Sequence, residues 1–118
     1  MKELSLRTPD LEWKENHQYA AGANAKELLT DEKLGLSAII LQLEPGWHMS
    51  EHAHIHTEIH YVIRGEYKSQ GKTYGKGTFR VIPKETNHGP FSSEKGATIL
   101  VLWINIEHRD SGSSETNE

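Results

Sequence analysis

Cysteine is absent from this chain of 118 residues. Its absence excludes disulfide bonds, thiolate zinc sites and a cysteine nucleophile, so any metal would have to be bound by nitrogen and oxygen donors. It also fits a reducing compartment. The chain has no apolar run long enough to span a bilayer, and its first residues, M-K-E-L-S-L, lack the apolar core of a secretory signal. We therefore expect a cytoplasmic protein that has no membrane partner.

Clusters of basic residues are missing as well. Lysine and arginine number 13 against 17 aspartates and glutamates, and the net charge of −4 comes from interspersed charges of both signs. A nucleic-acid-binding surface needs a basic stripe that displaces counterions from phosphates. We therefore expect no nucleic-acid partner. Residues 74–78 lack the spacing of a phosphate-binding loop, and no G-x-S-x-G sequence is present to supply a serine nucleophile.

Helical patterns are also scarce. Residues 20–29 are the only stretch with room for a helical turn or two, and Gly22 weakens it. Short apolar or alternating segments that end at turn residues dominate instead: residues 34–43, 59–67, 77–82 and 98–106. They predict a single all-β domain, either a sandwich or a barrel. We divide the chain into an N-terminal arm or strand over residues 1–24, a barrel over residues 25–108 and a flexible polar tail over residues 109–118.

What the chain does contain is histidine, concentrated in one short segment. Five of its eight histidines fall within residues 48–60. Four of these five share one parity with a glutamate in the run H-A-H-I-H-T-E-I-H: His52, His54, His56, His60 and Glu58. Residues i, i+2 and i+4 of an extended strand point to the same face, so a strand here would direct several imidazoles and one carboxylate to one side. That geometry is typical of a metal site.

The spacing of these residues resembles the two sequence motifs of the cupin superfamily. The first motif matches at every defining position: Gly46, five residues, His52-Ala53-His54, three residues, Glu58, six residues, Gly65. A second stretch is similar to the other cupin motif: Gly77, five residues, Pro83 and then His88. Glu85 stands where this motif usually has a glycine, and Ser92 stands where it often ends in asparagine. The resemblance covers residues 46–92 and implies a single-domain cupin-type double-stranded β-helix, or jelly-roll barrel.

The resemblance also implies one divalent metal inside the barrel. Its ligands would be the residues at the ligand positions of the two motifs: His52, His54, Glu58 and His88. Three neutral imidazoles and one carboxylate suit Fe(II), Mn, Ni, Cu or Zn, and they leave coordination positions open for water, substrate or oxygen. We expect His60 to be a catalytic residue, as a proton donor or acceptor in the cavity, and His56 to lie nearer the rim.

The expected function is that of a metal-dependent enzyme with a small-molecule substrate. A dioxygenase acting on an oxygen-rich compound is the first hypothesis, because three histidines and a glutamate fit it better than a hydrolase, which needs a positioned water and a clear general base. The second is an isomerase or lyase of a sugar or keto compound. The third is a non-catalytic, ligand-sensing metal cupin, since the chain also loosely resembles the cupin module of metal-bound anti-sigma regulators.

Two further expectations concern the surface. Residues 4–13 carry Leu4 and Leu6 at alternate positions, which would suit addition of a strand to a sheet edge, so we expect a homodimer. Arg80 lies between Phe79 and Val81. If those two face the core, strand alternation directs Arg80 to solvent.

Overall fold

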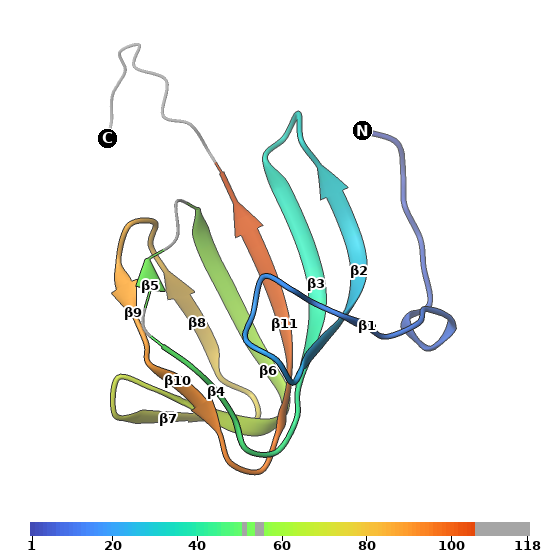
Figure 1. Cartoon of the computed structure of the whole chain (residues 1–118). Helices are drawn as coiled ribbons and strands as arrows, with labels where there is room; N and C mark the ends of the chain where they lie inside the picture. Colours follow the sequence, from blue (N-terminus) through green and yellow to red (C-terminus); the bar gives the residue numbers. More distant parts are fainter. Residues whose placement is uncertain (51, 54–55, 106–118) are drawn as a thin grey trace, which may run out of the picture.

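The computed structural model describes residues 1–50, 52–53 and 56–105, and for His52, Ala53 and His88 the description covers the backbone. Strands form nearly all the regular structure in this part of the chain (Figure 1). The elements, in chain order, are η1 (Thr8–Asp10), β1 (Lys14–Glu15), β2 (Ala23–Asp31), β3 (Leu36–Leu43), β4 (Trp47–Met49), β5 (His52–Ala53), β6 (Thr57–Ser69), β7 (Lys72–Gly75), β8 (Phe79–Ile82), β9 (Asn87–His88), β10 (Phe91–Ser93) and β11 (Ala97–Ile104). The all-β prediction is confirmed. No helix among the described residues is long and apolar enough to cross a membrane.

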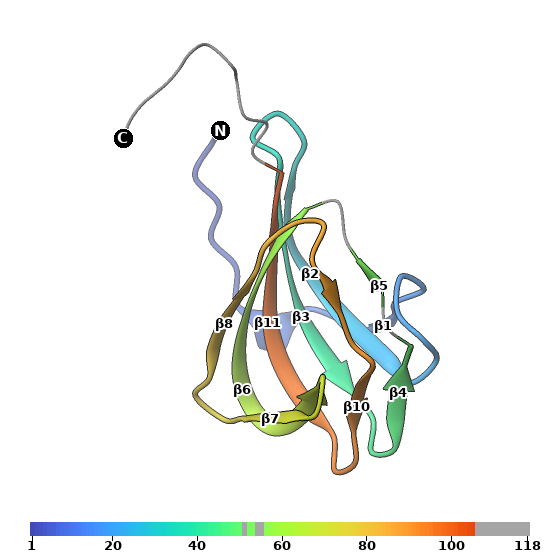
Figure 2. The ribbon, with the colours of Figure 1, turned by 90° about the vertical axis from the view of Figure 1, so that its left-hand side faces the viewer.

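The strands form two antiparallel walls that curl toward each other (Figures 1 and 2). One wall has the order β1-β2-β3-β11-β6, with β8 on the other side of β6. The second wall contains β7, the end of β6, β10 and β4. The β5–β9 ladder is hydrogen-bonded separately, and it extends the second wall because β5 follows β4 and β9 precedes β10 in the chain.

The predicted strand segments coincide with the observed strands. Residues 34–43 and 77–82 contain β3 and β8, residues 59–67 lie within β6, and residues 98–106 overlap β11 as far as they are described. The weak helix candidate, residues 20–29, instead enters β2. Ala23 and Ala25 are buried in this strand whereas Glu27 is exposed. Small side chains at alternate positions therefore pack against the inner face of the wall, and this packing outweighs intrinsic helix propensity.

Strand β6 belongs to both walls, and Gly65 is the point at which it passes from one to the other. Residues 57–65 of β6 pair with β11, whereas residues 66–69 pair with β7. Gly65 has a φ of 74°, and a Cβ atom there would collide with the carbonyl oxygen of Gly96. A register shift between β11 and β6 lies next to it, at Thr98 and Ile99. The bend therefore requires a residue without a side chain.

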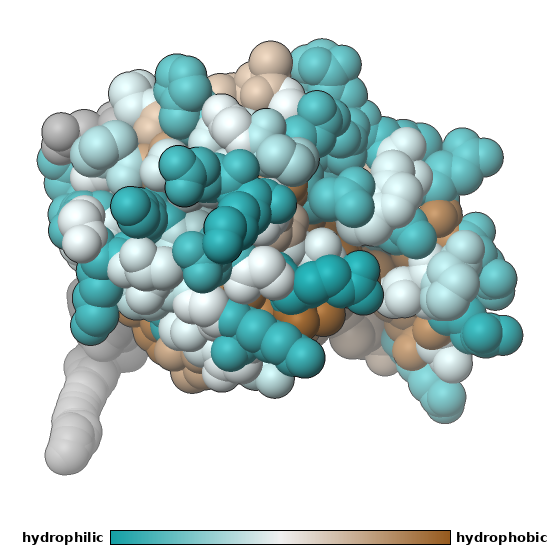
Figure 3. Space-filling model, turned by 90° about the horizontal axis from the view of Figure 1, so that it is seen from below, coloured by the Kyte–Doolittle hydropathy of each residue, from teal (hydrophilic) through white to brown (hydrophobic). Residues whose placement is uncertain are grey.

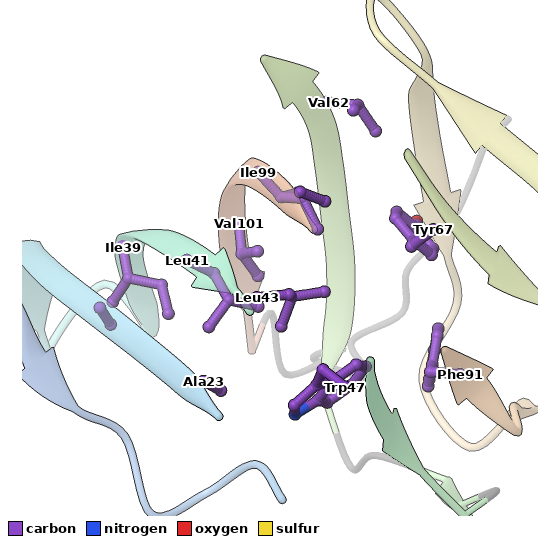
Figure 4. Close-up of a cluster of buried hydrophobic side chains, with 12 residues drawn as sticks. Ala23, Ile39, Leu41, Leu43, Trp47, Val62, Tyr67, Phe91, Ile99 and Val101 are labelled. Carbon is purple, nitrogen blue, oxygen red and sulfur yellow. The ribbon is translucent and has the colours of Figure 1, made fainter. Parts of the chain in front are cut away.

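Apolar side chains from both walls meet in a single core (Figure 4). Its members include Leu41, Val62 and Ile99 from the first wall and Trp47 and Phe91 from the second. Each is buried, and Val62 is completely so. Burial of these side chains is the main stabilising contribution to the barrel.

The loop between β1 and β2 is fixed across the sheet by Trp47. The indole Nε1 of Trp47 donates a hydrogen bond to the carbonyl oxygen of Ala20 at 3.0 Å, and the ring of Tyr19 packs against the indole with centroids 6.5 Å apart. Glu44 N also donates to the carbonyl oxygen of Gly22 at 2.9 Å. These contacts bring Tyr19, which is distant from both sequence motifs, to the inner side of the barrel.

The outer face of β6 and β8 exposes apolar side chains. Phe79 and Val81 of β8 are 65% and 51% exposed, and Tyr61, the cross-strand partner of Phe79, is 44% exposed. We call Tyr61, Phe79 and Val81 the outer patch. By contrast, the end of the barrel seen in Figure 3 is mainly hydrophilic and shows only small hydrophobic areas. The outer patch is therefore not a general property of this surface.

The first 13 residues lie outside the barrel, beyond β2 (Figure 1). Lys26 Nζ donates a hydrogen bond to the carbonyl oxygen of Thr8 at 2.9 Å and lies 4.8 Å from the centre of the Trp13 ring. Leu4 and Leu6 are 52% and 42% exposed. The start of the arm thus presents apolar side chains to solvent.

Candidate metal centre and adjoining cavity

The pairing of β5 with β9 brings predicted metal ligands from the two motifs together. His52 is the cross-strand partner of His88 in this ladder. His54 lies outside the described residues, so coordination by His52, His54, Glu58 and His88 stays a prediction. Among the described residues, which exclude the side chains of His52 and His88, no three histidine or carboxylate groups are arranged to hold a metal.

Glu58 is buried, with 2% of its surface exposed. One carboxylate oxygen accepts a hydrogen bond from His60 Nε2 at 2.7 Å, and the other accepts one from Trp103 Nε1 at 2.9 Å. The sheet register accounts for the second bond, because Trp103 on β11 is the cross-strand partner of Glu58 on β6. Charge-assisted bonds of this kind fix the orientation of a buried carboxylate.

His60 is also buried, and both of its ring nitrogens are hydrogen-bonded. Its Nδ1 lies 2.6 Å from the hydroxyl oxygen of Tyr67. Because Nε2 must donate to the Glu58 carboxylate, Nδ1 of a neutral ring accepts a hydrogen bond from the Tyr67 hydroxyl. Arg80 Nη1 in turn donates to the Tyr67 oxygen at 3.3 Å. We call this series, in which each residue donates to the next, the Arg80–Glu58 chain.

The electrostatics of Tyr67 agree with its role as a donor. Burial raises the pKa of Tyr67, whereas the hydrogen bond and positive charge of Arg80 lower it in part. The net pKa is above the ordinary value for tyrosine. The hydroxyl therefore keeps its proton and donates a hydrogen bond to His60 Nδ1.

The prediction that Arg80 faces solvent was wrong. Its guanidinium also donates to Ser69 Oγ at 3.2 Å and lies 4.2 Å from the centre of the Tyr74 ring. Its neighbours Phe79 and Val81 are the exposed residues of β8. Arg80 does face away from Phe79 and Val81, as strand alternation requires. The error was to assume that the two apolar residues face the core. Hydroxyl groups and an aromatic ring can compensate a guanidinium inside a barrel.

A cavity of about 670 Å³ adjoins this network. Trp103 belongs to both, because it lines the cavity while its indole nitrogen binds Glu58. His56 also lines the cavity, and its Nδ1 is buried without a hydrogen-bond partner among the described residues. The volume falls within the range that is typical of sites for small molecules.

Tyr19 is the residue of this cavity that sequence reasoning missed. It lines the wall, and its hydroxyl is buried without a hydrogen-bond partner among the described residues. Burial raises the pKa of Tyr19 well above its ordinary value, and the negative charge of Glu58 adds to the rise. Nothing in the sequence indicated this position, because a loop that is fixed by Trp47 brings the residue here.

The donor types at the predicted ligand positions suit a divalent transition metal. Imidazole nitrogen and carboxylate oxygen are suitable ligands for such ions. The structure brings the backbones of His52 and His88 into one residue pair, and it orients the buried Glu58 carboxylate through His60 and Trp103. Nδ1 of His56 has no hydrogen-bond partner among the described residues, so the described part of the chain does not satisfy every polar group at this end of the barrel.

Comparison with known families shows which family the chain is related to. A family model for the ChrR cupin-like domain matches residues 1–106. The chain belongs to this family. The predicted cupin superfamily and cupin barrel are thereby confirmed. No curated protein matches the sequence.

Solved structures show the same cupin fold at low sequence identity. A candidate acetylacetone dioxygenase from Methylibium petroleiphilum superposes with a TM-score of 0.79 and 14% identity, covering 88% of this cupin and 78% of that chain. A predicted oxalate decarboxylase from Thermotoga maritima gives a TM-score of 0.70 and 18% identity, covering 87% and 100%. The anti-sigma ChrR of Rhodobacter sphaeroides, solved in complex with SigE, superposes with a TM-score of 0.65 and 19% identity, covering 82% of this cupin and 51% of that chain. These likenesses establish the fold.

Proposed function

We propose that this cupin is a mononuclear divalent-metal enzyme that acts on an oxygen-rich small molecule by a dioxygenase reaction. The observation that carries the proposal is the shared position of Trp103, which lines the cavity and binds the Glu58 carboxylate. A molecule in the cavity would therefore lie beside the proposed metal ligands His52, His54, Glu58 and His88. The similarity in fold to a candidate acetylacetone dioxygenase supports this reaction class.

The metal would supply Lewis acidity and the redox chemistry that dioxygen requires. The chain's own residues would orient the ligands and hold protons. Trp103 and His60 fix both oxygens of Glu58, and Tyr67 fixes the tautomer of His60. We propose that His60 acts as a positioning residue, which keeps its Nε2 proton on the Glu58 carboxylate as a hydrogen bond, since both of its ring nitrogens are engaged within the Arg80–Glu58 chain.

The test combines elemental analysis with oxygen consumption. Protein purified without a histidine tag should contain about one transition metal per chain and should consume oxygen when acetylacetone is added. His88→Ala should lose both properties, because it removes the ligand from the second motif. His48→Ala is the matched control, since His48 is exposed on β4. A wild-type protein without stoichiometric metal would contradict the proposal.

Two alternatives have distinct outcomes in the same experiment. Turnover of a keto compound or sugar under argon, with zinc, nickel or manganese bound, would instead indicate an isomerase or lyase. A non-catalytic, ligand-sensing role is favoured by the match to the ChrR cupin-like family. That role predicts a bound metal, loss of metal in His88→Ala, and no turnover of any compound tested.

We also propose that this cupin forms a homodimer. The outer patch and the exposed Leu4 and Leu6 are apolar surfaces on one chain that a second copy would cover. Strand β8 pairs only with β6 in the described part of the chain, so its other edge is available to the arm of a partner.

A further inference from the structure

The turn between β6 and β7 contains a residue that its backbone conformation disfavours. Ser69 pairs with Lys72, so the turn has two residues, Gln70 and Gly71. Both have a positive φ, 54° and 78°. Two-residue turns of this kind favour asparagine or glycine at the first position, because other side chains are strained at a positive φ. Gln70 therefore carries a conformational cost that another residue would avoid, and such costs are often retained at functional sites.

The side chain of Gln70 reaches the strand that carries a predicted metal ligand. Its Nε2 donates a hydrogen bond to the carbonyl oxygen of Asn87 at 3.0 Å. Asn87 is the first residue of β9 and directly precedes His88. The backbone pairing of β10 with β6 ends at Phe91 and Ser69, because β6 turns back after Ser69. The amide of Gln70 therefore binds the chain beyond the last backbone pair of that ladder.

Strand β9 has little backbone pairing of its own. It pairs with β5 alone in the described part of the chain, through two residue pairs. A ladder of this length gives little order by itself. The bond from Gln70 ties β9 to the end of β6, the strand that also carries Glu58. The Gln70 side chain thus connects the strands of two predicted ligands, Glu58 and His88, which come from different motifs.

We propose that Gln70 is a positioning residue of the metal centre: its amide holds the backbone of β9 and thereby fixes the place of His88 relative to Glu58. This inference rests on the proposed function, because it requires that His88 and Glu58 bind a metal. Gln70 acts through the backbone of Asn87 and touches neither metal nor substrate. Replacing residues that hold metal ligands in place weakens metal binding, because an ion favours ligands that are already arranged for it.

Gln70→Asn separates this role from the formation of the turn. Asparagine is favoured at a positive φ, so the melting temperature should stay within about 2 °C of the parent value or rise. The side chain is shorter by one carbon–carbon bond, about 1.5 Å, and its amide should no longer reach the Asn87 carbonyl. Zinc should then bind about threefold to tenfold more weakly, which is the effect expected of one lost hydrogen bond.

The affinity can be measured by competition for Zn²⁺ between a chromophoric chelator and the full chain, stripped of metal beforehand. Gln70→Asn and Gln70→Gly should both raise the zinc dissociation constant about threefold to tenfold. His88→Ala, which lacks a predicted ligand, identifies the zinc ion that belongs to this site. Nitrogen-15 relaxation of the metal-free protein gives a second readout. The order parameters of the Asn87 and His88 amides should fall by at least about 0.1 in both Gln70 variants.

Gln42→Asn is the matched control. It shortens a glutamine by the same carbon on β3, where the cross-strand partners are Asn24 and Thr98. It should leave the zinc dissociation constant and the order parameters of β9 unchanged. Equal zinc affinity in Gln70→Asn and the parent protein would overturn the inference. So would weaker zinc binding that is accompanied by a loss of thermal stability, because Gln70 would then serve only to stabilise the turn.

The failure of this inference is distinguishable from the failure of the proposed function. Zinc binding that does not depend on Gln70 would overturn the inference and leave the dioxygenase proposal in place. Weaker zinc binding in the Gln70 variants of a protein that consumes no oxygen with acetylacetone would support the inference and contradict the dioxygenase. A parent protein that binds no zinc would overturn both.

Discussion

Glu85 occupies a backbone conformation that favours glycine. Its φ is 62°, in the left-handed region, where side chains other than glycine cost about 1 to 2 kcal/mol. The second cupin motif usually has glycine at this position, and the turn keeps the corresponding conformation although the residue differs. The departure from the motif therefore lowers stability locally and leaves the course of the chain intact.

We predict that Glu85→Gly raises the free energy of unfolding by about 0.5 to 1 kcal/mol, because the relief of left-handed strain exceeds the added entropy of the unfolded chain. Chemical denaturation measures the change. Lys84→Gly is the control, since Lys84 does not have a positive φ, and it should lower stability instead. Equal effects of the two variants would contradict the explanation.

Tyr67 connects Arg80 to His60, and its hydroxyl is the central group of the Arg80–Glu58 chain. Removing it leaves His60 Nδ1 without its donor and Arg80 without one acceptor, in a buried environment. We predict that Tyr67→Phe lowers the free energy of unfolding by about 1 to 3 kcal/mol. Thermal denaturation with Tyr61→Phe as the exposed counterpart checks this, and similar melting temperatures for the two variants would argue against the chain.

The residues of the site differ in how far the sequence reveals them. Glu58 and His60 follow from strand parity, since both are buried on one face of β6. Arg80 was placed on the wrong face because its neighbours Phe79 and Val81 are apolar and yet exposed. Its partners Tyr67 and Tyr74 are brought to it only in the folded barrel. Tyr19 carries no signal at all, because its position depends on the hydrogen bond between Trp47 and Ala20.

At the scale of elements, β6 depends on a single glycine for its passage between the walls. We predict that Gly65→Ala lowers the free energy of unfolding by at least about 2 kcal/mol, since the added methyl group meets the carbonyl oxygen of Gly96 and the residue also has a positive φ. Chemical denaturation measures the loss.

Gly71→Ala provides the comparison for this variant. Gly71 has a similar φ of 78°, but a Cβ atom there would meet nothing within 4 Å. Its variant therefore reports the conformational cost alone. A loss of stability at Gly71 equal to that at Gly65 would mean that the collision contributes nothing.

Strand prediction succeeded where apolar alternation and turn residues coincided, as in β3, β6 and β11. It failed in β2, because Ala23 and Ala25 are small and helix-compatible, and because their burial depends on β3 beside them. The resemblance to two motifs implied that His52 and His88 serve one site, but it did not predict the pairing of β5 with β9. The two-residue strands themselves carry no periodicity that a sequence could show.

At the scale of the whole molecule, the homodimer leads to a prediction about mass. Light scattering after gel filtration should give the mass of two chains. Phe79→Glu should shift it to one chain, because a charge in the outer patch would have to be buried without a partner. Leu34→Glu, at an exposed leucine in the turn between β2 and β3, should remain a dimer. A wild-type mass of one chain would contradict the homodimer.

The β5–β9 ladder has a consequence for the molecule as a whole. It consists of two residue pairs and is hydrogen-bonded to no other strand in the described part of the chain, so its own contribution to order is small. If His52 and His88 bind one metal ion, metal binding and formation of this ladder become linked equilibria, and each favours the other. Amide exchange in β5 and β9 would then follow the metal supply while the two walls stayed protected. One end of the barrel would in this way report metal availability as a change in local order.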